Sequence, residues 1–209
     1  MTSSTSSATP ATVYIVDDDD AYRKAMTRLI TAKGYRAVAF ASAEEFLAGQ
    51  VTGHGCILLD VRMPGLSGLQ LQQELAARND IPPIIFVTGH ASVPMSVAAI
   101  KAGAEDFLSK PISADVLFPA IEAALARSES SSQQQSVYAE LRERFEQMTP
   151  REREVFDLVI RGRLNKQIAF ELGTTERTIK AHRQQVMCKM AAATVQQLVA
   201  MAQKLGIEF

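Results

Sequence analysis

The stretch "VYIVDDDDAYR", residues 13–23, joins a short apolar run to four consecutive aspartates. The apolar run is rich in β-branched and aromatic residues, which is typical of a buried strand. Four like charges in succession repel one another, so the aspartates are either a solvated loop or part of a cluster that binds a cation. Which reading holds depends on the residues that the fold brings beside Asp17 and Asp18.

The chain has 209 residues, of which 47% are apolar, and this predicts a globular protein of two domains. No apolar run approaches the ~20 residues of a membrane span, so no membrane partner is expected. Residues 1–11 lack the basic start and apolar centre of a secretory signal, which predicts a disordered tail and a cytoplasmic location. Cys56 and Cys188 show neither a zinc-binding nor a disulfide pattern.

Charge is divided unevenly along the chain. Residues 1–126 carry 9 basic and 13 acidic residues, a net charge of −4, whereas residues 149–209 carry 10 and 6, a net charge of +4. An acidic front and a basic back predict two domains with different partners, and the basic part permits binding to nucleic acid.

Five strand-like runs alternate with amphipathic helical patterns in the first 127 residues. The runs are "VYIV" (13–16), "AVAF" (37–40), "CILLD" (56–60), "IIFVT" (84–88) and "DFLSK" (106–110). Strands that alternate with helices predict a parallel sheet covered on both faces. We assign it the flavodoxin-like strand order 2-1-3-4-5, one of the two common orders of such sheets. The predicted fold class is therefore α/β for residues 12–127, followed by an all-α domain.

Several local signals mark the ends of these helices. Gly34 and Gly103 predict helix stops, and Ser42 with Glu45 predicts a capping box. The last helical pattern of this part, residues 113–127, places Val116 among its apolar positions. Pro119 falls inside that pattern, where it would cost up to ~3 kcal/mol unless the helix starts late or bends.

Residues 128–148 are predicted to be a linker that is partly helical. The segment "RSESSSQQQS" (127–136) is polar and low in complexity, which predicts a flexible boundary. After it, Val137, Leu141, Phe145 and Met148 form one apolar stripe that leads into the next domain or pairs with another chain. Whether the whole linker is coil or one long helix stays open.

Residues 149–209 show helical patterns only and predict a small four-helix domain. Thr149, Pro150 and Glu152 form an N-terminal signature, and residues 165–184, "NKQIAFELGTTERTIKAHRQ", have the layout of a helix-turn-helix. Residues at the start of the second helix of such a unit reach base edges in the major groove. The outer face of that helix shows Arg177, Lys180, Arg183 and Gln184.

Polar residues stand at the ends of four predicted strands of the front domain. Asp17 and Asp18 follow the first strand, Asp60 ends the third, Thr88 the fourth and Lys110 the fifth. In the order 2-1-3-4-5, the carboxyl ends of the first and third strands flank the crevice where ligands bind, so the three aspartates should converge there. Three carboxylates in one crevice favour a cation, and oxygen ligands suit Mg²⁺, with Mn²⁺ as an alternative.

Other readings of the aspartates fit less well. A calcium-binding EF-hand loop needs glycine where this chain has Tyr22. A haloacid-dehalogenase-like phosphatase needs an aspartate two positions after its nucleophile and a Thr or Val two positions after that, where "DDDDA" has Ala21. Asp19 and Asp20 are predicted to open the first helix, where negative charge meets the positive end of the helix dipole.

The motifs "IVDD", "LLDVRMPGLSG", "FVTGH" and "FLSKP" resemble those of the two-component receiver domain, and residues 88–111 are similar to the FixJ branch in particular. The resemblance covers residues 11–126. It implies that Asp60 accepts phosphate from a sensor histidine kinase and that Asp17 and Asp18 form the acidic pair. It also implies that Asp18, Asp60 and the main-chain carbonyl of Arg62 hold Mg²⁺, beside Asp17. Thr88 and Phe107 would be the switch residues that report phosphorylation to the surface of the fourth helix and fifth strand, and the Lys110–Pro111 bond would be cis.

Residues 144–209 resemble the LuxR-type DNA-binding domain through "TPRE", "NKQIA", "ERTIKAHR" and "KM". The resemblance implies base contacts from Lys180, Ala181 and Gln184. It implies contacts to the DNA backbone from Lys166, Thr175, Arg177, Thr178 and Arg183, and dimerisation through the last helix, residues 194–204. The three alanines of "MAAAT" depart from the family pattern and leave the docking of that helix open.

Together, the two resemblances predict a response regulator of the NarL/FixJ type, which is not a turnover enzyme. It would form a homodimer when phosphorylated and bind double-stranded promoter DNA, with RNA polymerase as a further candidate partner. Two rival hypotheses are a Mg²⁺-dependent phosphohydrolase with a regulatory tail and a protein-interaction module that signals without DNA. Sustained turnover of phosphate esters would favour the first, and an absence of salt-dependent DNA binding the second.

Overall fold

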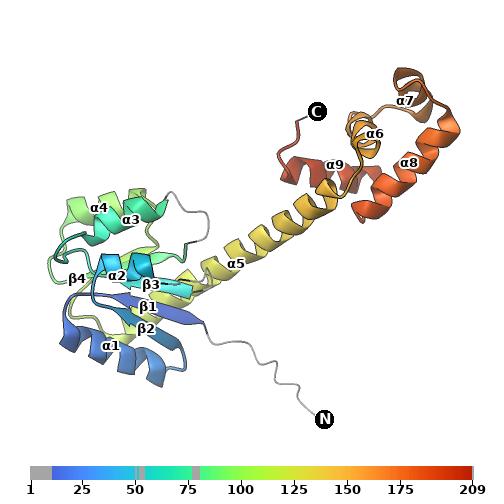
Figure 1. Ribbon diagram of the computed structural model, residues 1–209. Coiled ribbons are helices and arrows are strands. Elements are labelled where there is room, and N and C mark those ends of the chain that lie inside the picture. Colours follow the sequence, from blue (N-terminus) through green and yellow to red (C-terminus); the bar gives the residue numbers. More distant parts are fainter. Residues whose placement is uncertain (1–10, 50, 52–54, 77–80, 209) are drawn as a thin grey trace, which may run out of the picture. The chain divides into compact units, whose positions relative to one another are not determined.

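A computed structural model describes residues 11–49, 51, 55–76 and 81–208 of the chain (Figure 1). The predicted N-terminal tail lies outside the described residues, except for Ala11. The chain divides into two compact units, Met1–Ser132 and Gln133–Phe209, and each is described by itself. Within the described residues, no helix combines the length and the apolar character that crossing a membrane requires.

The first unit is built on a parallel five-stranded sheet in the order β2-β1-β3-β4-β5. Its strands are β1 (Thr12–Val16), β2 (Arg36–Phe40), β3 (Gly55–Leu59), β4 (Ile84–Thr88) and β5 (Asp106–Ser109). The helices between and after them are α1 (Asp20–Ala32), α2 (Ala43–Ala48), α3 (Gly68–Ala76), α4 (Val93–Lys101) and α5 (Ala114–Glu146). The predicted flavodoxin-like α/β fold and its strand order are confirmed.

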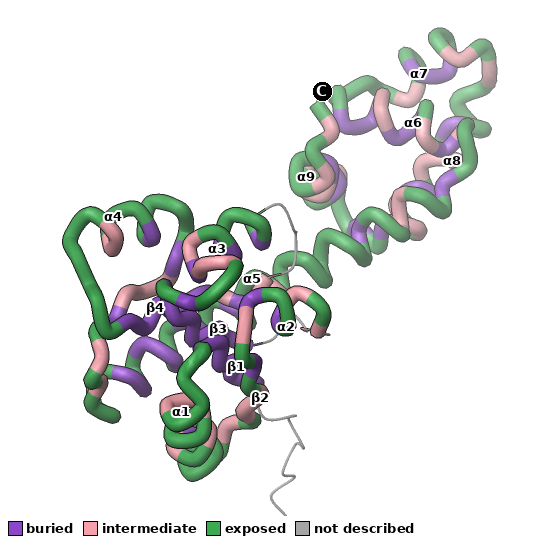
Figure 2. Tube along the Cα trace, turned by 60° about the vertical axis from the view of Figure 1, so that its left-hand side comes forward, coloured by how far each residue is buried: buried purple, intermediate pink, exposed green. Residues whose placement is uncertain are grey.

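The helices cover both faces of this sheet because alternate residues of each strand point to opposite sides (Figure 2). Val13 and Ile15 pack with α1 and α5, through side chains such as Met26 and Ile121. Tyr14 and Val16 point the other way, into a cluster with side chains of α2, α3 and α4: Ala43, Phe46, Leu71, Leu75 and Ala99. Strands β1, β3 and β4 are buried at every position, as strands covered on both faces must be.

The helix ends follow the local signals with one exception. Asp19 caps α1, and Gly34 and Gly103 follow α1 and α4 with φ values of 96° and 95°, which glycine adopts without strain. Ser42 caps α2 by accepting a hydrogen bond from the amide of Glu45. The reciprocal half of the predicted capping box is different, because the Glu45 carboxylate accepts from the amide of Ala41 instead of Ser42.

Helix α5 differs from the expectation of a flexible boundary. It begins five residues before Pro119, so the proline lies inside the helix, and it continues without a break through the polar segment to Glu146. In the first unit, Leu117, Ile121 and Ala124 are fully buried, whereas Val116 is 51% exposed and is not a core position. The division between the two units falls within this helix.

The second unit contains the end of α5 and four further helices: α6 (Pro150–Ile160), α7 (Asn165–Glu171), α8 (Glu176–Lys189) and α9 (Val195–Lys204). Thr149 and Glu152 form the predicted capping box of α6. Leu141 and Met148 are buried in the core of this unit, and the ring of Phe145 packs edge-on against Phe156. Leu141, Phe145 and Met148 of the predicted apolar stripe therefore pack in the core of the second unit, whereas Val137 is exposed.

The connection between α8 and α9 contains the departure "MAAAT". Ala191 has a φ of 51°, the left-handed conformation in which helices commonly end, and Ala192 is buried. Thr194 caps α9, whose Leu198 and Ala202 are fully buried in the core cluster. The small alanine side chains allow α9 to dock despite the unusual connection.

Candidate functional site

Three aspartates meet at the carboxyl ends of β1 and β3. These two strands are neighbours, and Val16 pairs with Leu59, so Asp17 and Asp60 leave the sheet side by side. Ligand oxygens of Asp17, Asp18 and Asp60 lie within 4.8 Å of one another. Asp17 and Asp60 are buried, with exposures of 2% and 8%, and Asp18 is exposed. The arrangement is a negatively charged pocket with one open side.

Lys110 supplies positive charge to this pocket from the end of β5. Its ammonium nitrogen, Nζ, lies 2.5 Å from Oδ2 of Asp17 and 2.9 Å from Oδ2 of Asp60, so it bridges the two buried carboxylates. The peptide bond between Lys110 and Pro111 is cis, as the receiver resemblance implies.

Burial acts on the pKa values of the charged groups in the pocket. Burial raises the pKa of Asp17 above its usual value, although hydrogen bonds from Lys110 and from the amide of Asp19 oppose this. Burial also acts to lower the pKa of Lys110, but the hydrogen bonds and charges of Asp17 and Asp60 outweigh it, so that pKa is raised. Lys110 therefore stays charged and partly neutralises the carboxylates.

Hydrogen bonds from neighbouring residues hold both buried aspartates in place. Oδ1 of Asp17 accepts from the amide of Asp19, and the main-chain carbonyl of Asp17 accepts from Nη1 of Arg23 at 2.7 Å. Oδ1 of Asp60 accepts from the amide of Arg62 at 3.1 Å, which brings Arg62 to the edge of the pocket. The first and second aspartates of the run thus line the pocket, while Asp19 caps α1 and Asp20 is its first residue.

Two features of the site were not predicted from the sequence. The ring of Tyr22 lies under the Lys110 ammonium, with Nζ 3.9 Å from the ring centroid. Gly68 packs against the main chain of Asp60 so closely that a Cβ atom would lie 2.1 Å from the Asp60 carbonyl oxygen. No sequence pattern pairs Tyr22 with a lysine 88 positions away.

Thr88 is the last residue of β4, and Phe107 lies on the neighbouring strand β5. Thr88 is buried, and its hydroxyl oxygen accepts from the amide of His90 at 3.3 Å. Phe107 is half-buried, and its ring centroid lies 6.0 Å from that of Phe86, its partner in the β4–β5 register. The two predicted switch residues therefore occupy adjacent strands at one side of the sheet.

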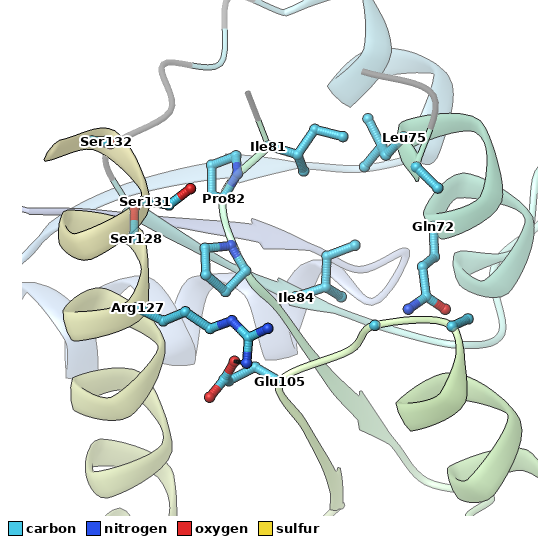
Figure 3. Close-up of a pocket in the computed structure, with 14 residues that line it drawn as sticks. Gln72, Leu75, Ile81, Pro82, Ile84, Glu105, Arg127, Ser128, Ser131 and Ser132 are labelled. Carbon is cyan, nitrogen blue, oxygen red and sulfur yellow. Dashed lines mark ion pairs between the residues drawn. The ribbon is translucent and has the colours of Figure 1, made fainter. Parts of the chain in front are cut away.

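A separate hollow of about 280 Å³ lies at the opposite ends of the strands (Figure 3). It is lined by the end of α3, by Pro82 and Pro83 before β4, by Glu105 before β5, and by Arg127 and Ser128 of α5. Arg127 and Glu105 form an ion pair across part of it, with N and O atoms 3.3 Å apart. None of the predicted site residues lines this hollow, so it is distinct from the aspartate pocket.

The helix-turn-helix candidate consists of α7, the turn at Gly173 and α8. The inner faces of α7 and α8 bury four side chains in the core of the second unit: Ile168, Ala169, Ile179 and Val186. Thr175 caps α8 by accepting from the amide of Thr178. The predicted DNA-contacting side chains are exposed on this unit, except that Arg183 is half-buried: Lys166, Thr175, Arg177, Thr178, Lys180, Ala181 and Gln184.

Arg183 has a partner inside the domain. Its Nη1 atom donates to Oδ1 of Asn165 at 2.9 Å, which ties α8 to the first residue of α7. The side chain therefore supports the packing of the two helices, whatever it contacts outside the protein.

Comparison with known proteins matches the two units to two families. Residues 13–122 match the family described as "Response regulator receiver domain", and residues 146–202 match "Bacterial regulatory proteins, luxR family". Nodulation protein W of Bradyrhizobium diazoefficiens is 45% identical over 97% of this chain and 90% of its own length. The transcriptional regulatory protein FixJ of Azorhizobium caulinodans is 41% identical over 93% of each chain.

A solved structure of the response regulator StyR is similar across both units. It is 41% identical, covers 92% of this chain and 98% of its own, and has a TM-score of 0.83. The aspartate pocket fits the receiver family, and the helix-turn-helix fits the luxR family. The chain therefore belongs to the two-component response regulators of the NarL/FixJ type, and it is a transcriptional regulator of the FixJ branch with a receiver domain and a LuxR-type DNA-binding domain.

Proposed function

We propose that Asp60 is the residue that receives a phosphoryl group from a sensor histidine kinase. The observation that carries this proposal is the convergence of Asp17, Asp18 and Asp60, with Lys110 bridging two of them. A carboxylate oxygen of Asp60 attacks phosphorus, and the phosphorus–nitrogen bond to the kinase histidine breaks. The electron pair stays on that imidazole, which then takes up a proton. Lys110 and the hydroxyl of Thr88 stabilise the charge on the transferred group.

The donor set of the pocket fits Mg²⁺, or Mn²⁺ in its place. Three carboxylates offer oxygen atoms within 4.8 Å, one side is open to water, and burial already disfavours the uncompensated charge of Asp17. Asp17, Asp18 and Asp60 would hold the ion together with the carbonyl of Arg62. When bound, the ion supplies positive charge to the oxygens of the phosphoryl group.

The test is the uptake of phosphate by purified protein from acetyl phosphate, with and without EDTA. We expect about one phosphate per chain in the presence of Mg²⁺ and none in Asp60→Asn. Asp20→Asn is the matched control, since Asp20 is exposed, pairs with Lys24 and lies outside the cluster. Phosphorylation of Asp60→Asn at the wild-type level contradicts the proposal, and many turnovers per chain favour the phosphohydrolase hypothesis.

We further propose that phosphorylation controls DNA binding through a receiver homodimer. Thr88 and Phe107 would transmit the change from the pocket to α4 and β5, because they lie on the adjoining strands. Two linked DNA-binding domains then meet an inverted-repeat promoter site together and gain affinity through effective concentration.

Binding to promoter DNA is tested by salt titration. Lys166→Ala should weaken binding to all DNA sequences. The slope of the logarithm of the binding constant against the logarithm of the salt concentration should become less steep by about 1, as the loss of one phosphate contact predicts. Lys180→Ala and Gln184→Ala should each cost about 1–3 kcal/mol and relax sequence preference. Arg161→Ala removes an exposed charge at the end of α6 that is outside the predicted DNA-contacting set, and it serves as the control. If all four variants lost the same affinity for DNA, the assignment of α8 as the helix that contacts the bases would be contradicted.

A further inference from the structure

Tyr22 forms a close aromatic contact with the charge at the centre of the pocket. Nζ of Lys110 lies 3.9 Å from the centroid of its ring, well inside the ~6 Å at which a cation and a ring face attract each other. The receiver has a second contact of this kind, between Lys33 and Phe118, but there the distance is 5.1 Å. The Lys110 side chain is only 18% exposed, so water screens its attraction to the ring weakly.

The ring of Tyr22, and not its hydroxyl, makes this contact. The hydroxyl oxygen is buried and has no hydrogen-bond partner among the described residues. Leaving such a group without a partner is unfavourable, so packing alone would favour phenylalanine or an aliphatic residue at this position. Burial raises the pKa of the phenol to about 12, so the ring faces Lys110 as a neutral aromatic group.

The first turn of α1 fixes the ring next to the aspartates. The amide of Tyr22 donates to Oδ1 of Asp19, and the amide of Asp19 donates to Oδ1 of Asp17. Tyr22 is therefore built onto the same hydrogen-bonded turn that orients a buried carboxylate of the pocket. Three groups surround the ammonium of Lys110: the carboxylates of Asp17 and Asp60, and the ring face of Tyr22.

We propose that Tyr22 is a positioning residue, whose ring holds the Lys110 ammonium beside Asp60 in the pocket and thereby speeds phosphoryl transfer. This inference rests on the proposed role of Asp60. A lysine side chain has four rotatable bonds and loses much of its freedom when it is held in one place. Because the ring already restricts the Lys110 side chain before the reaction, less conformational entropy is lost during phosphoryl transfer.

The test compares Tyr22→Leu and Tyr22→Phe in the full chain. NMR of the unphosphorylated protein is expected to show the Lys110 side-chain protons shifted by the ring current in wild type and in Tyr22→Phe, and to lose that shift in Tyr22→Leu. The rate of Asp60 phosphorylation by acetyl phosphate should fall about two- to thirtyfold in Tyr22→Leu, the range of a cation–π contact. In Tyr22→Phe it should stay within about twofold of wild type.

Tyr35→Leu is the matched control, because Tyr35 is a second partly buried tyrosine packed against the same core cluster. It should leave both the Lys110 signals and the rate unchanged, which separates positioning from a general loss of packing. Wild-type rate and Lys110 signals in Tyr22→Leu would overturn the inference, as would an equal loss in Tyr22→Phe, which would point to the hydroxyl. If the proposed role of Asp60 is wrong, the result is a different one: the wild type itself is not phosphorylated.

Discussion

At the scale of residues, the run Asp17 to Asp20 divides into two pairs with different tasks. Asp17 and Asp18 contribute oxygens to the pocket, whereas Asp19 caps α1 and Asp20 pairs with Arg23 and Lys24 on its first turn. The division follows from geometry, because the strand ends at Val16 and the helix begins at Asp20. Repulsion within the run is relieved by different partners on each side: Lys110 for the pocket, and the helix dipole for the cap.

Gly68 gives a prediction at this scale. A Cβ atom there would lie 2.1 Å from the carbonyl oxygen of Asp60, and a main-chain atom cannot move aside cheaply. Gly68→Ala should therefore lower the free energy of unfolding of the receiver by about 1–3 kcal/mol, as overpacking does. Urea unfolding followed by circular dichroism measures the loss.

The control for this prediction is Gly89→Ala. Gly89 follows Thr88 at the same edge of the sheet, and a Cβ atom there would meet nothing within 4 Å. We expect a change within about 0.5 kcal/mol for that variant, as for other substitutions that touch nothing. Equal stability of Gly68→Ala and wild type would show that the main chain around Asp60 yields more easily than the structure indicates.

At the scale of elements, α5 departs furthest from its sequence signals. A proline within the helix and a polar segment of low complexity both disfavour it, yet the helix runs from Ala114 to Glu146. Each end buries apolar side chains in a different core, Leu117 and Ile121 in the first unit and Leu141 in the second. Burial of this kind outweighs the few kcal/mol that weak helical propensity and one missing hydrogen bond cost.

The stripe at the end of α5 gives a prediction for this element. Leu141 is 6% exposed, so Leu141→Ala should destabilise the second unit by about 2–5 kcal/mol through lost burial and a cavity. Val137 belongs to the same predicted stripe but is 42% exposed, and Val137→Ala should have little effect. Hydrogen exchange of the full chain, read on α6 to α9, measures both. Similar losses for the two variants would mean that the stripe packs as one surface.

At the scale of the whole molecule, each of the two units has its own core, and helix α4 of the receiver exposes apolar side chains. Helix α4 exposes Val93 by 76% and Val97 and Ile100 by 46% each, at spacings that form one stripe. An apolar stripe on a receiver helix beside β5 is suited to the proposed homodimer, because its burial in a complex is favourable.

This stripe gives the prediction for the assembled protein. With beryllofluoride and Mg²⁺ as a phosphate mimic, we expect wild type to dimerise and Val97→Glu to dimerise at least tenfold more weakly, because a charge would enter the apolar contact. Ala98→Glu is the matched control, since Ala98 is exposed on another side of the same helix. Analytical ultracentrifugation measures both, and undiminished dimerisation of Val97→Glu would exclude the α4 stripe from the contact.

The sequence by itself determined the order of strands and helices along the chain and the class of each domain, α/β followed by all-α. It could do so because burial on both strand faces, helix caps and glycine stops are local or periodic signals that need no knowledge of distant partners. It also indicated which strand ends carry Asp17, Asp60 and Lys110, since parallel strands align their carboxyl ends at one edge.

Only the tertiary structure decided the contacts between residues far apart in the chain. The ring of Tyr22 under Lys110, the close approach of Gly68 to Asp60 and the bond from Arg183 to Asn165 depend on how helices pack, and no spacing rule encodes them. The same reason explains the helical course of α5, because two distant cores outweigh the local preference of its polar middle.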